Sequence, residues 1–133
     1  MKPPRMTRAP HLATLGCALA LAGPVQSQTP APTPGAPHRP SVQECREVGE
    51  FVRNAALSRD NGVSESSFMD RLEGDLMAIR GHPPALRWFA QDRGTEAFLI
   101  RAARTVFANP REPREHETET VRACLDYIAE GAT

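Results

Sequence analysis

The stretch SVQECREVGEFVRNAALSRDNG at residues 41–62 decides the fold class. Ser41 and Glu44 form a capping box, in which each side chain binds the exposed backbone N–H of the other residue. Gly62 suits the left-handed conformation that commonly ends a helix. Between these ends, apolar residues recur at helical spacing, at Val42, Cys45, Val48, Val52, Ala55 and Ala56. The stretch therefore predicts one amphipathic helix whose apolar face is buried.

Two further segments show the same pattern. Ser64 is the expected cap of a second helix, which Gly81-His82-Pro83-Pro84 brings to an end. Pro84 is well placed as the first residue of the next helical segment. The last helix is expected over residues 117–129. The expected buried positions of the second helix are Phe68, Leu72, Leu76 and Ile79. Those of the last helix are Val121, Cys124, Leu125 and Ile128.

The region at residues 84–108 leaves two alternatives open. Leu86, Phe89 and Ala90 form a short apolar stripe, which Gly94-Thr95 interrupts before a longer helix that ends ahead of Pro110. The region is either one kinked helix or two separate pieces. No useful length of the chain alternates between apolar and polar residues, so no strand is expected. We therefore predict an all-α fold, a small bundle of four or five helices.

The beginning of the chain has the features of a secretory signal. Lys2, Arg5 and Arg8 precede an apolar run at residues 12–22, and small residues lead up to Ser27. We expect residues 1–27 to be removed after Ser27. The run is shorter than the roughly 20 apolar residues that a membrane-spanning helix needs. Cys17 leaves a minority alternative, a lipid anchor, although Thr14 stands where a lipidation motif usually has leucine.

A proline-rich segment separates this signal from the helical region. Residues 28–40 read QTPAPTPGAPHRP and contain five prolines. Such a segment neither forms a helix nor pairs in a sheet, so we expect a disordered, polyproline-like spacer. The predicted organisation is thus a signal at residues 1–27, a spacer at residues 28–40 and a helical domain at residues 41–130.

Removal of the signal changes both the cysteine content and the charge. Only Cys45 and Cys124 then remain, and an even number of cysteines in a small exported chain argues for a disulfide. Both lie on expected buried faces, so the bond would join the first helix to the last. The remaining chain has 13 basic residues, all of them arginine, and 16 acidic residues, which gives a net charge of −3. Such a domain lacks the clustered basic face that nucleic-acid binding needs.

The sequence offers no chemistry typical of an enzyme. There is no Gly-x-Ser-x-Gly nucleophile motif, no Cys-x-x-Cys pair and no lysine after residue 27. His38, His82 and His116 fall in the spacer, in a Gly/Pro turn and in a charged loop, where we expect solvated side chains rather than a metal site. We therefore expect no catalytic activity, no cofactor and no bound metal.

Trp88-Phe89 is the most interesting candidate site. Neighbouring residues of a helix point about 100° apart, so Phe89 and Trp88 cannot both lie at the centre of one apolar stripe. An exposed tryptophan beside Arg87 and Arg93 is typical of a protein-binding hot spot. The alternative is that Trp88 covers the edge of a small core and is stacked by an arginine.

Cys45-Arg-Glu-Val-Gly49, followed by Ser58-Arg-Asp-Asn-Gly-Val-Ser64, resembles a pattern found in one group of proteins. These are small exported bacterial helical proteins, mostly uncharacterised, with one cysteine in the first helix and one in the last. The resemblance covers residues 41–128 and implies an architecture but no function. The layout is also similar to that of the periplasmic acid-stress chaperones, whose motif residues are missing here, so that likeness is an analogy only.

The sequence is compatible with two main hypotheses about function. The first is a periplasmic or secreted non-enzymatic protein that binds another envelope protein as chaperone, inhibitor or accessory subunit. The second is a small-ligand binder in which arginines contact an anion. Arg101 and Arg104 are its candidate contacts, and the alternative for both, which the sequence favours, is a solvated side chain. A pH-triggered chaperone is a third possibility and requires acid unfolding that exposes the core. The oligomeric state, the partner and the process stay open.

Overall fold

The computed structural model describes residues 36–131 of the 133-residue chain. The expected signal, its cleavage site and Cys17 lie outside the described residues, as do residues 28–35 of the expected spacer. In the part that is described, the segment ahead of the first helix has no regular secondary structure, and residues 42–130 form the helical bundle.

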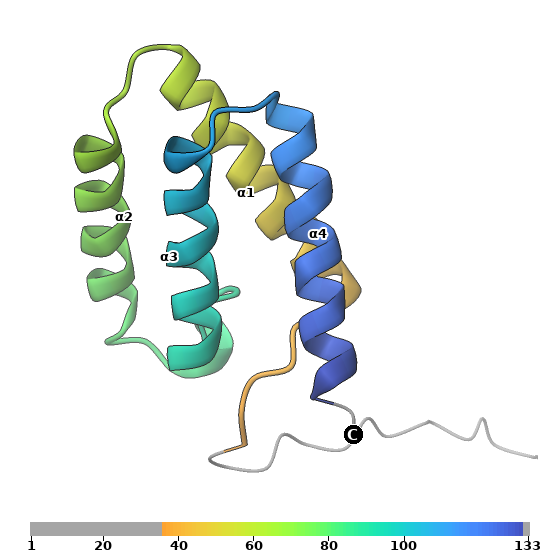
Figure 1. Cartoon of the computed structure of the whole chain (residues 1–133). Coiled ribbons are helices and arrows are strands. Elements are labelled where there is room, and N and C mark those ends of the chain that lie inside the picture. The colour runs from red at the N-terminus through yellow and green to blue at the C-terminus, as the bar shows by residue number, and fades with distance from the viewer. Residues whose placement is uncertain (1–35, 132–133) are drawn as a thin grey trace, which may run out of the picture. The chain divides into compact units, whose positions relative to one another are not determined.

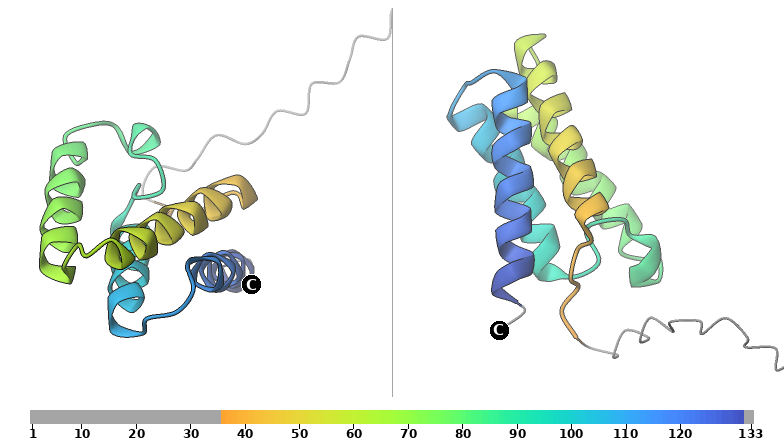
Figure 2. Two further views of the ribbon diagram at one scale, coloured as in Figure 1. Left: turned by 90° about the horizontal axis from the view of Figure 1, so that it is seen from above. Right: turned by 90° about the vertical axis from the view of Figure 1, so that its right-hand side faces the viewer.

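Four α-helices and one short 3-10 helix make up the described residues (Figure 1). In chain order they are α1 (Val42–Asp60), α2 (Glu65–Ile79), η1 (Pro84–Leu86), α3 (Arg93–Ala108) and α4 (Pro113–Glu130). Residues 36–131 contain no strand, and the prediction of an all-α bundle is confirmed. Seen from two sides, α2 and α4 lie at opposite flanks of the bundle, with α1 and α3 between them (Figures 1 and 2).

The ends of α1 are those that the sequence predicted. The hydroxyl of Ser41 accepts a hydrogen bond from the backbone N–H of Glu44 at 3.1 Å, and the carboxylate of Glu44 accepts one from the N–H of Ser41 at 2.7 Å. At the other end, Gly62 has a φ of +87°, a conformation that glycine adopts without a steric penalty. The predicted cap of α2 is also present, since Ser64 accepts from the N–H of Ser67 at 3.2 Å.

The open question at residues 84–108 is resolved in favour of two pieces. The helix α3 begins after Asp92, whose carboxylate accepts from the N–H of Thr95 at 2.9 Å while the Thr95 hydroxyl accepts from the N–H of Asp92 at 3.2 Å. Gly94-Thr95 therefore belongs to the first turn of α3, and the predicted interruption there is wrong. Leu86 is 70% exposed, so it is not part of the buried stripe with Phe89.

The helix α4 begins at Pro113, earlier than the sequence analysis placed it. Pro113 occupies the first turn, where its missing N–H needs no partner. The connection from α3 is correspondingly short, at residues 109–112. This difference moves His116 from the expected charged loop into the helix.

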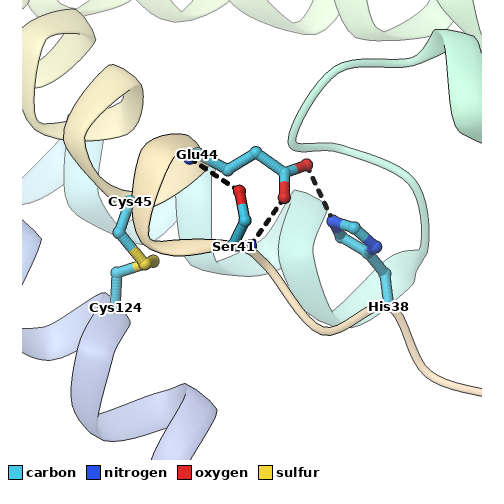
Figure 3. Close-up of a disulfide and its surroundings, with 5 residues drawn as sticks. All are labelled: His38, Ser41, Glu44, Cys45 and Cys124. Atoms are coloured by element: carbon cyan, nitrogen blue, oxygen red, sulfur yellow. Dashed lines mark hydrogen bonds and ion pairs between the residues drawn. A yellow bond between two sulfur atoms is a disulfide. The ribbon is translucent and has the colours of Figure 1, made fainter. Parts of the chain in front are cut away.

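Helices α1 and α4 pack closely against each other from the first turn of α1 onward. Cys45 and Cys124 are bonded, with their Cα atoms 5.5 Å apart and both side chains inaccessible to solvent (Figure 3). The predicted disulfide between the first and last helices is confirmed. One turn further along α1, a β-carbon at Gly49 would lie 2.5 Å from Cγ2 of Val121. The two backbones approach because this position carries no side chain.

The aromatic residues of the sequence form one continuous series of ring contacts. The series runs from α4 through α3 and the loop before it to α1, then to α2 and back to the end of α3. Its members in order are Tyr127, Phe98, Phe89, Trp88, Phe51, Phe68 and Phe107, with neighbouring ring centroids 5.4–6.2 Å apart. Because aromatic pairs in tilted arrangements are favourable beyond the area that they bury, this series ties all four helices to one core.

Helix α2 is held by a single face. Met69, Leu72 and Leu76 are buried against the core, whereas the remaining positions of the helix are exposed or half-buried.

Among the helices of residues 36–131, none has the length and apolar character needed to cross a membrane.

Candidate functional site

The loop between α2 and α3 has an unusual backbone at Trp88. After the short helix η1, the N–H groups of Leu86 and Arg87 donate to the carbonyls of Pro83 and Pro84 at 2.8 and 3.0 Å. Trp88 then has a φ of +53°, and it is the only residue other than glycine with a positive φ among the described residues. A bulky side chain in this region costs of order 1–3 kcal/mol, a strain that surrounding contacts must sustain.

Three contacts hold Trp88 in this conformation. Its indole N–H donates to the carboxylate of Glu47 on α1 at 2.8 Å. Its ring lies against Phe51 of α1 and against Phe89, which follows it and is fully buried. The hydrogen bond from Trp88, followed by one from Gln43, lowers the pKa of Glu47. The indole is thus held by a carboxylate and by rings, rather than stacked by an arginine as the sequence alternative supposed, and it remains 37% exposed.

Arginines gather on the other side of this loop. Arg80, Arg87 and Arg93 line an open hollow of about 740 Å³ together with Asp92, Glu96 and three apolar residues, Ala90, Ala97 and Ile100. The structure therefore brings Arg87 and Arg93 together as neighbours and adds Arg80, which sequence reasoning missed. Trp88 does not line the hollow, because its side chain turns toward α1.

The charges of the hollow are only partly paired. Arg80 forms an ion pair with Glu96. The Nε of Arg87 donates to the carbonyl oxygen of His82 at 2.7 Å, which fixes the side chain and leaves the far end of the guanidinium without a partner among the described residues. Arg93, on the first turn of α3, has no hydrogen bond or ion pair within residues 36–131. Two guanidinium groups are therefore free to bind an anion or a polar group.

Asp92 is committed to the fold rather than to a ligand. Its carboxylate accepts from the N–H and hydroxyl of Thr95 at 2.9 and 3.0 Å, and from the N–H of His38 at 2.5 Å. Burial alone would raise the pKa of Asp92, but these hydrogen bonds outweigh it and lower the pKa. The carboxylate therefore stays ionised at neutral pH, and its oxygens are already used.

The end of the expected spacer packs onto the domain beside this site. The ring of His38 lies 3.0 Å from the carboxylate of Glu44, which also accepts from Ser41 (Figure 3). Pro40 is buried. Residues 38–40, which were expected to belong to the spacer, therefore pack against the helical domain. His38 contacts both Glu44 at the start of α1 and Asp92 at the start of α3.

The other expected contacts lie apart from the hollow. Arg104 on α3 is exposed and pairs with Glu73 of α2 at 3.5 Å, and Arg101 is exposed on the same helix. Neither lines the hollow, so the prediction that they form the anion site is not supported by their position. In the described part of the chain, no three residues among His, Cys, Asp and Glu are grouped so that they could hold a metal ion.

His116 differs most from its expected environment. The sequence predicts a solvated loop histidine, and this prediction is wrong: α4 already begins at Pro113, and the side chain of His116 is 3% exposed. The start of α4 lies where α1 and α3 end, at the end of the bundle opposite the loop at residues 83–92 that contains Trp88 (Figure 1). His82, in contrast, is exposed as expected.

Comparisons with known proteins give no relative on which to base a function. No protein-family model, no curated protein and no solved structure matches the chain. The function is therefore inferred from the geometry of the site and from the sequence. The Trp88 loop and the neighbouring hollow are the features that bear on it.

Proposed function

We propose that the protein is exported and acts, without catalysing a reaction, by binding another protein of the cell envelope. The binding surface is the Trp88 loop, defined as residues 83–92, with the exposed guanidinium of Arg93 beside it. Export is supported by the basic and apolar pattern of residues 1–27 and by the buried Cys45–Cys124 disulfide, which persists in oxidising compartments.

The strained backbone of Trp88 carries the proposal. Glycine would make the same turn without a steric cost, yet the chain places its only tryptophan there. Residues with a strained backbone of this kind cluster at binding and catalytic sites, where the strained conformation pre-organises the side chains that act there. With this backbone conformation the indole contacts α1, and Leu86 is 70% and Trp88 37% exposed.

The surroundings of the loop match the composition of protein-binding surfaces. Tryptophan and arginine are the residues most enriched among those that dominate binding energy. Trp88 supplies a ring that is already held in place by Glu47, so little conformational freedom is lost on binding. Beside it, Arg93 and the far end of the Arg87 guanidinium supply charged donors that have no partner among the described residues, while Nε of Arg87 donates to the carbonyl oxygen of His82.

Site-specific photo-cross-linking in cells that export the chain tests this proposal. Leu86→p-benzoylphenylalanine places the reactive group on the loop, and Met77→p-benzoylphenylalanine, at 68% exposure on α2, is the matched control. We expect a discrete adduct at position 86 that excess wild-type protein competes away and a Trp88→Ala protein does not. Equal adducts at both positions, or none at position 86, contradict the proposal.

The mass of the exported protein tests the compartment separately. We expect a chain of residues 28–133 that is lighter by two hydrogens because of the disulfide. A chain that begins at Cys17 and carries the mass of a lipid would instead support the membrane-anchored alternative. A chain that retains residues 1–27 contradicts export by cleavage.

The hollow favours a second candidate, a binder of small anions. Its volume of about 740 Å³ falls within the range of ligand sites, roughly 300–1,000 Å³. Arg87 and Arg93 offer planar donors suited to carboxylate or phosphate. Titration with inorganic phosphate and with succinate, followed by amide chemical shifts, tests it. We expect saturable shifts at Ala90 and Ala97 that Arg93→Gln abolishes and Arg101→Gln does not, and shifts that never saturate rule it out.

A further inference from the structure

His116 is enclosed where three helices meet. Its side chain is 3% exposed and lies on the second turn of α4, against the ends of α1 and α3. Nε2 of the ring is 3.4 Å from Nη1 of Arg59 on α1. Burial lowers the pKa of the ring, and the backbone of Asn109, the residue after α3, acts in the opposite direction. Burial of an ionisable group is costly unless the group is neutral or its charge is paired and hydrogen-bonded.

The contact with Arg59 requires a neutral ring. A guanidinium has only donor groups, so Nε2 of His116 makes a hydrogen bond with it only while that nitrogen carries a lone pair. The proton of the neutral ring is then on Nδ1. A second proton would replace the lone pair by an N–H and would set two cations 3.4 Å apart.

Arg59 is also the residue that holds the α3–α4 connection in place. Its Nη1 donates to the carbonyl oxygen of Val106 at 2.7 Å, and its Nη2 donates to that of Arg111 at 2.8 Å. The first bond satisfies one of the last carbonyl groups of α3, which have no partner within the helix. Asp60, next to it on α1, pairs with Arg59 at 2.7 Å and keeps the guanidinium oriented.

The charges that face His116 from the surrounding elements are mostly positive. Arg59 approaches from α1 and Arg111 from the connection, and both disfavour a proton on the ring. Glu119, one turn further along α4, favours it, but this carboxylate is paired with Arg111. Burial first, and then these two arginines, lower the pKa of His116 below its ordinary value.

We infer that acid opens this junction locally: protonation of His116 repels Arg59, so that the connection at residues 109–112 and the last turn of α3 detach from the end of α1. The disulfide joins α1 to α4 well away from this end, so the middle of the α1–α4 pair stays closed. The inference holds whether or not the Trp88 loop binds a partner, because the two sites lie at opposite ends of the bundle (Figure 1).

The direction of the pH effect follows from the lowered pKa. An unfolded or opened chain binds the proton at the ordinary histidine value of about 6.5, whereas the closed junction binds it only at a lower pH. The closed state is therefore stabilised fully above about pH 6.5, and this stabilisation is lost as the pH falls from that value through the pKa of the closed state.

Two measurements on the full chain, with its disulfide intact, test the inference. The first is the titration of the His116 ring by nuclear magnetic resonance. The second is the hydrogen-exchange protection of the amides of residues 107–109, 115 and 116, corrected for intrinsic rates, between about pH 7.5 and about pH 5, which brackets the ordinary titration of histidine. We expect the protection of these amides to be lost as the pH falls, because the lowered pKa of His116 makes protonation favour the opened junction, while amides 45–52 keep their protection.

The variants separate His116 from the other titrating groups. His116→Gln keeps an acceptor that reaches Arg59 but takes up no proton, so its protection should not change with pH over this range. His82→Gln, which removes an exposed histidine, should behave as the wild type. A His116 ring that titrates at or above its ordinary value overturns the inference, and so does an equal loss of protection in His116→Gln. The titration of the wild type decides the matter even if that variant does not fold.

Discussion

Replacement of Gly49 by alanine measures how closely α1 and α4 approach each other. The new β-carbon would lie 2.5 Å from Cγ2 of Val121 and 3.3 Å from the carbonyl oxygen of Glu117. Neither neighbour yields easily, because the χ1 angle of valine is stiff in a helix and the carbonyl belongs to the backbone of α4. Forcing a methyl group into a packed contact of this kind costs about 1–3 kcal/mol.

Gly74→Ala is the matched control, because it changes a helix interior without a steric contact. A β-carbon at Gly74 on α2 meets nothing within 4 Å. Alanine is favoured over glycine inside a helix by about 0.5–1 kcal/mol at either site. We therefore expect Gly74→Ala to raise the free energy of unfolding by that amount, and Gly49→Ala to leave it about 1–3 kcal/mol below the value of the control.

Urea unfolding of the oxidised protein, followed by circular dichroism, provides the assay. Adding Val121→Ala to Gly49→Ala removes the obstructing methyl group. The double variant should recover part of the loss, with a coupling free energy of at least about 0.5 kcal/mol, as residues in contact show. Equal stabilisation by Gly49→Ala and Gly74→Ala would refute the close approach of the two helices.

Three further predictions concern the disulfide, the start of α3 and the Trp88 loop. Replacing both Cys45 and Cys124 by alanine should lower the free energy of unfolding by at most about 4.5 kcal/mol by the loop-entropy relation, because the bond spans 79 positions; an unchanged urea midpoint contradicts this. Asp92→Ala removes the cap of α3 and should cost about 1 kcal/mol at neutral pH. Since the pKa of Asp92 is lowered in the fold, this stabilisation is present above the ordinary carboxyl pKa of about 4 and is lost as the pH falls through the folded value. If the difference in the free energy of unfolding between Asp92→Ala and the wild type stays constant as the pH is lowered below about 4, the ionised carboxylate is not the cause of the stabilisation. Glu47→Ala should shift the fluorescence emission of Trp88, the only tryptophan, to longer wavelengths, because the indole loses the hydrogen bond that holds it against α1; identical spectra would show that the bond does not hold the ring.

The start of α3 shows why one helix end was missed. Gly94-Thr95 reads locally as a break in the apolar stripe, since glycine is unfavourable in helix interiors. In the structure Thr95 takes the reciprocal part in the capping box that glutamate more often takes. Gly94 is tolerated in the first turn, where a β-carbon would lie 3.0 Å from the hydroxyl of Tyr127 on α4. That contact depends on a residue far along the chain, and no local pattern contains it.

The start of α4 was missed for a different reason. Pro113 is a local marker for the first turn of a helix, but it also stands within a charged segment, residues 109–116, that has the composition of a loop. With the helix begun there, the 3.6-residue period turns His116 inward. The sequence thus contained the information for the helix start, but the burial of His116 also needed the ends of α1 and α3 to meet it.

The candidate site could be predicted only in part. The sequence pointed to Trp88 with Arg87 and Arg93, which are close together along the chain. Arg80 joins Arg87 and Arg93 because the loop turns back on itself between α2 and α3. The positive φ of Trp88 has no sequence signature, since it results from the burial of Phe89 on one side and the bond to Glu47 on the other.

By itself, the sequence determined the class of the fold, the ends of α1, the cap of α2 and the disulfide. Helix caps and apolar stripes depend on residues three or four positions apart, and two remaining cysteines permit one pairing. Only the tertiary structure decided the burial of His116, the strain at Trp88 and the grouping of the three arginines. Each of these brings together side chains from separate elements, and their positions follow from the packing of all four helices rather than from any local preference.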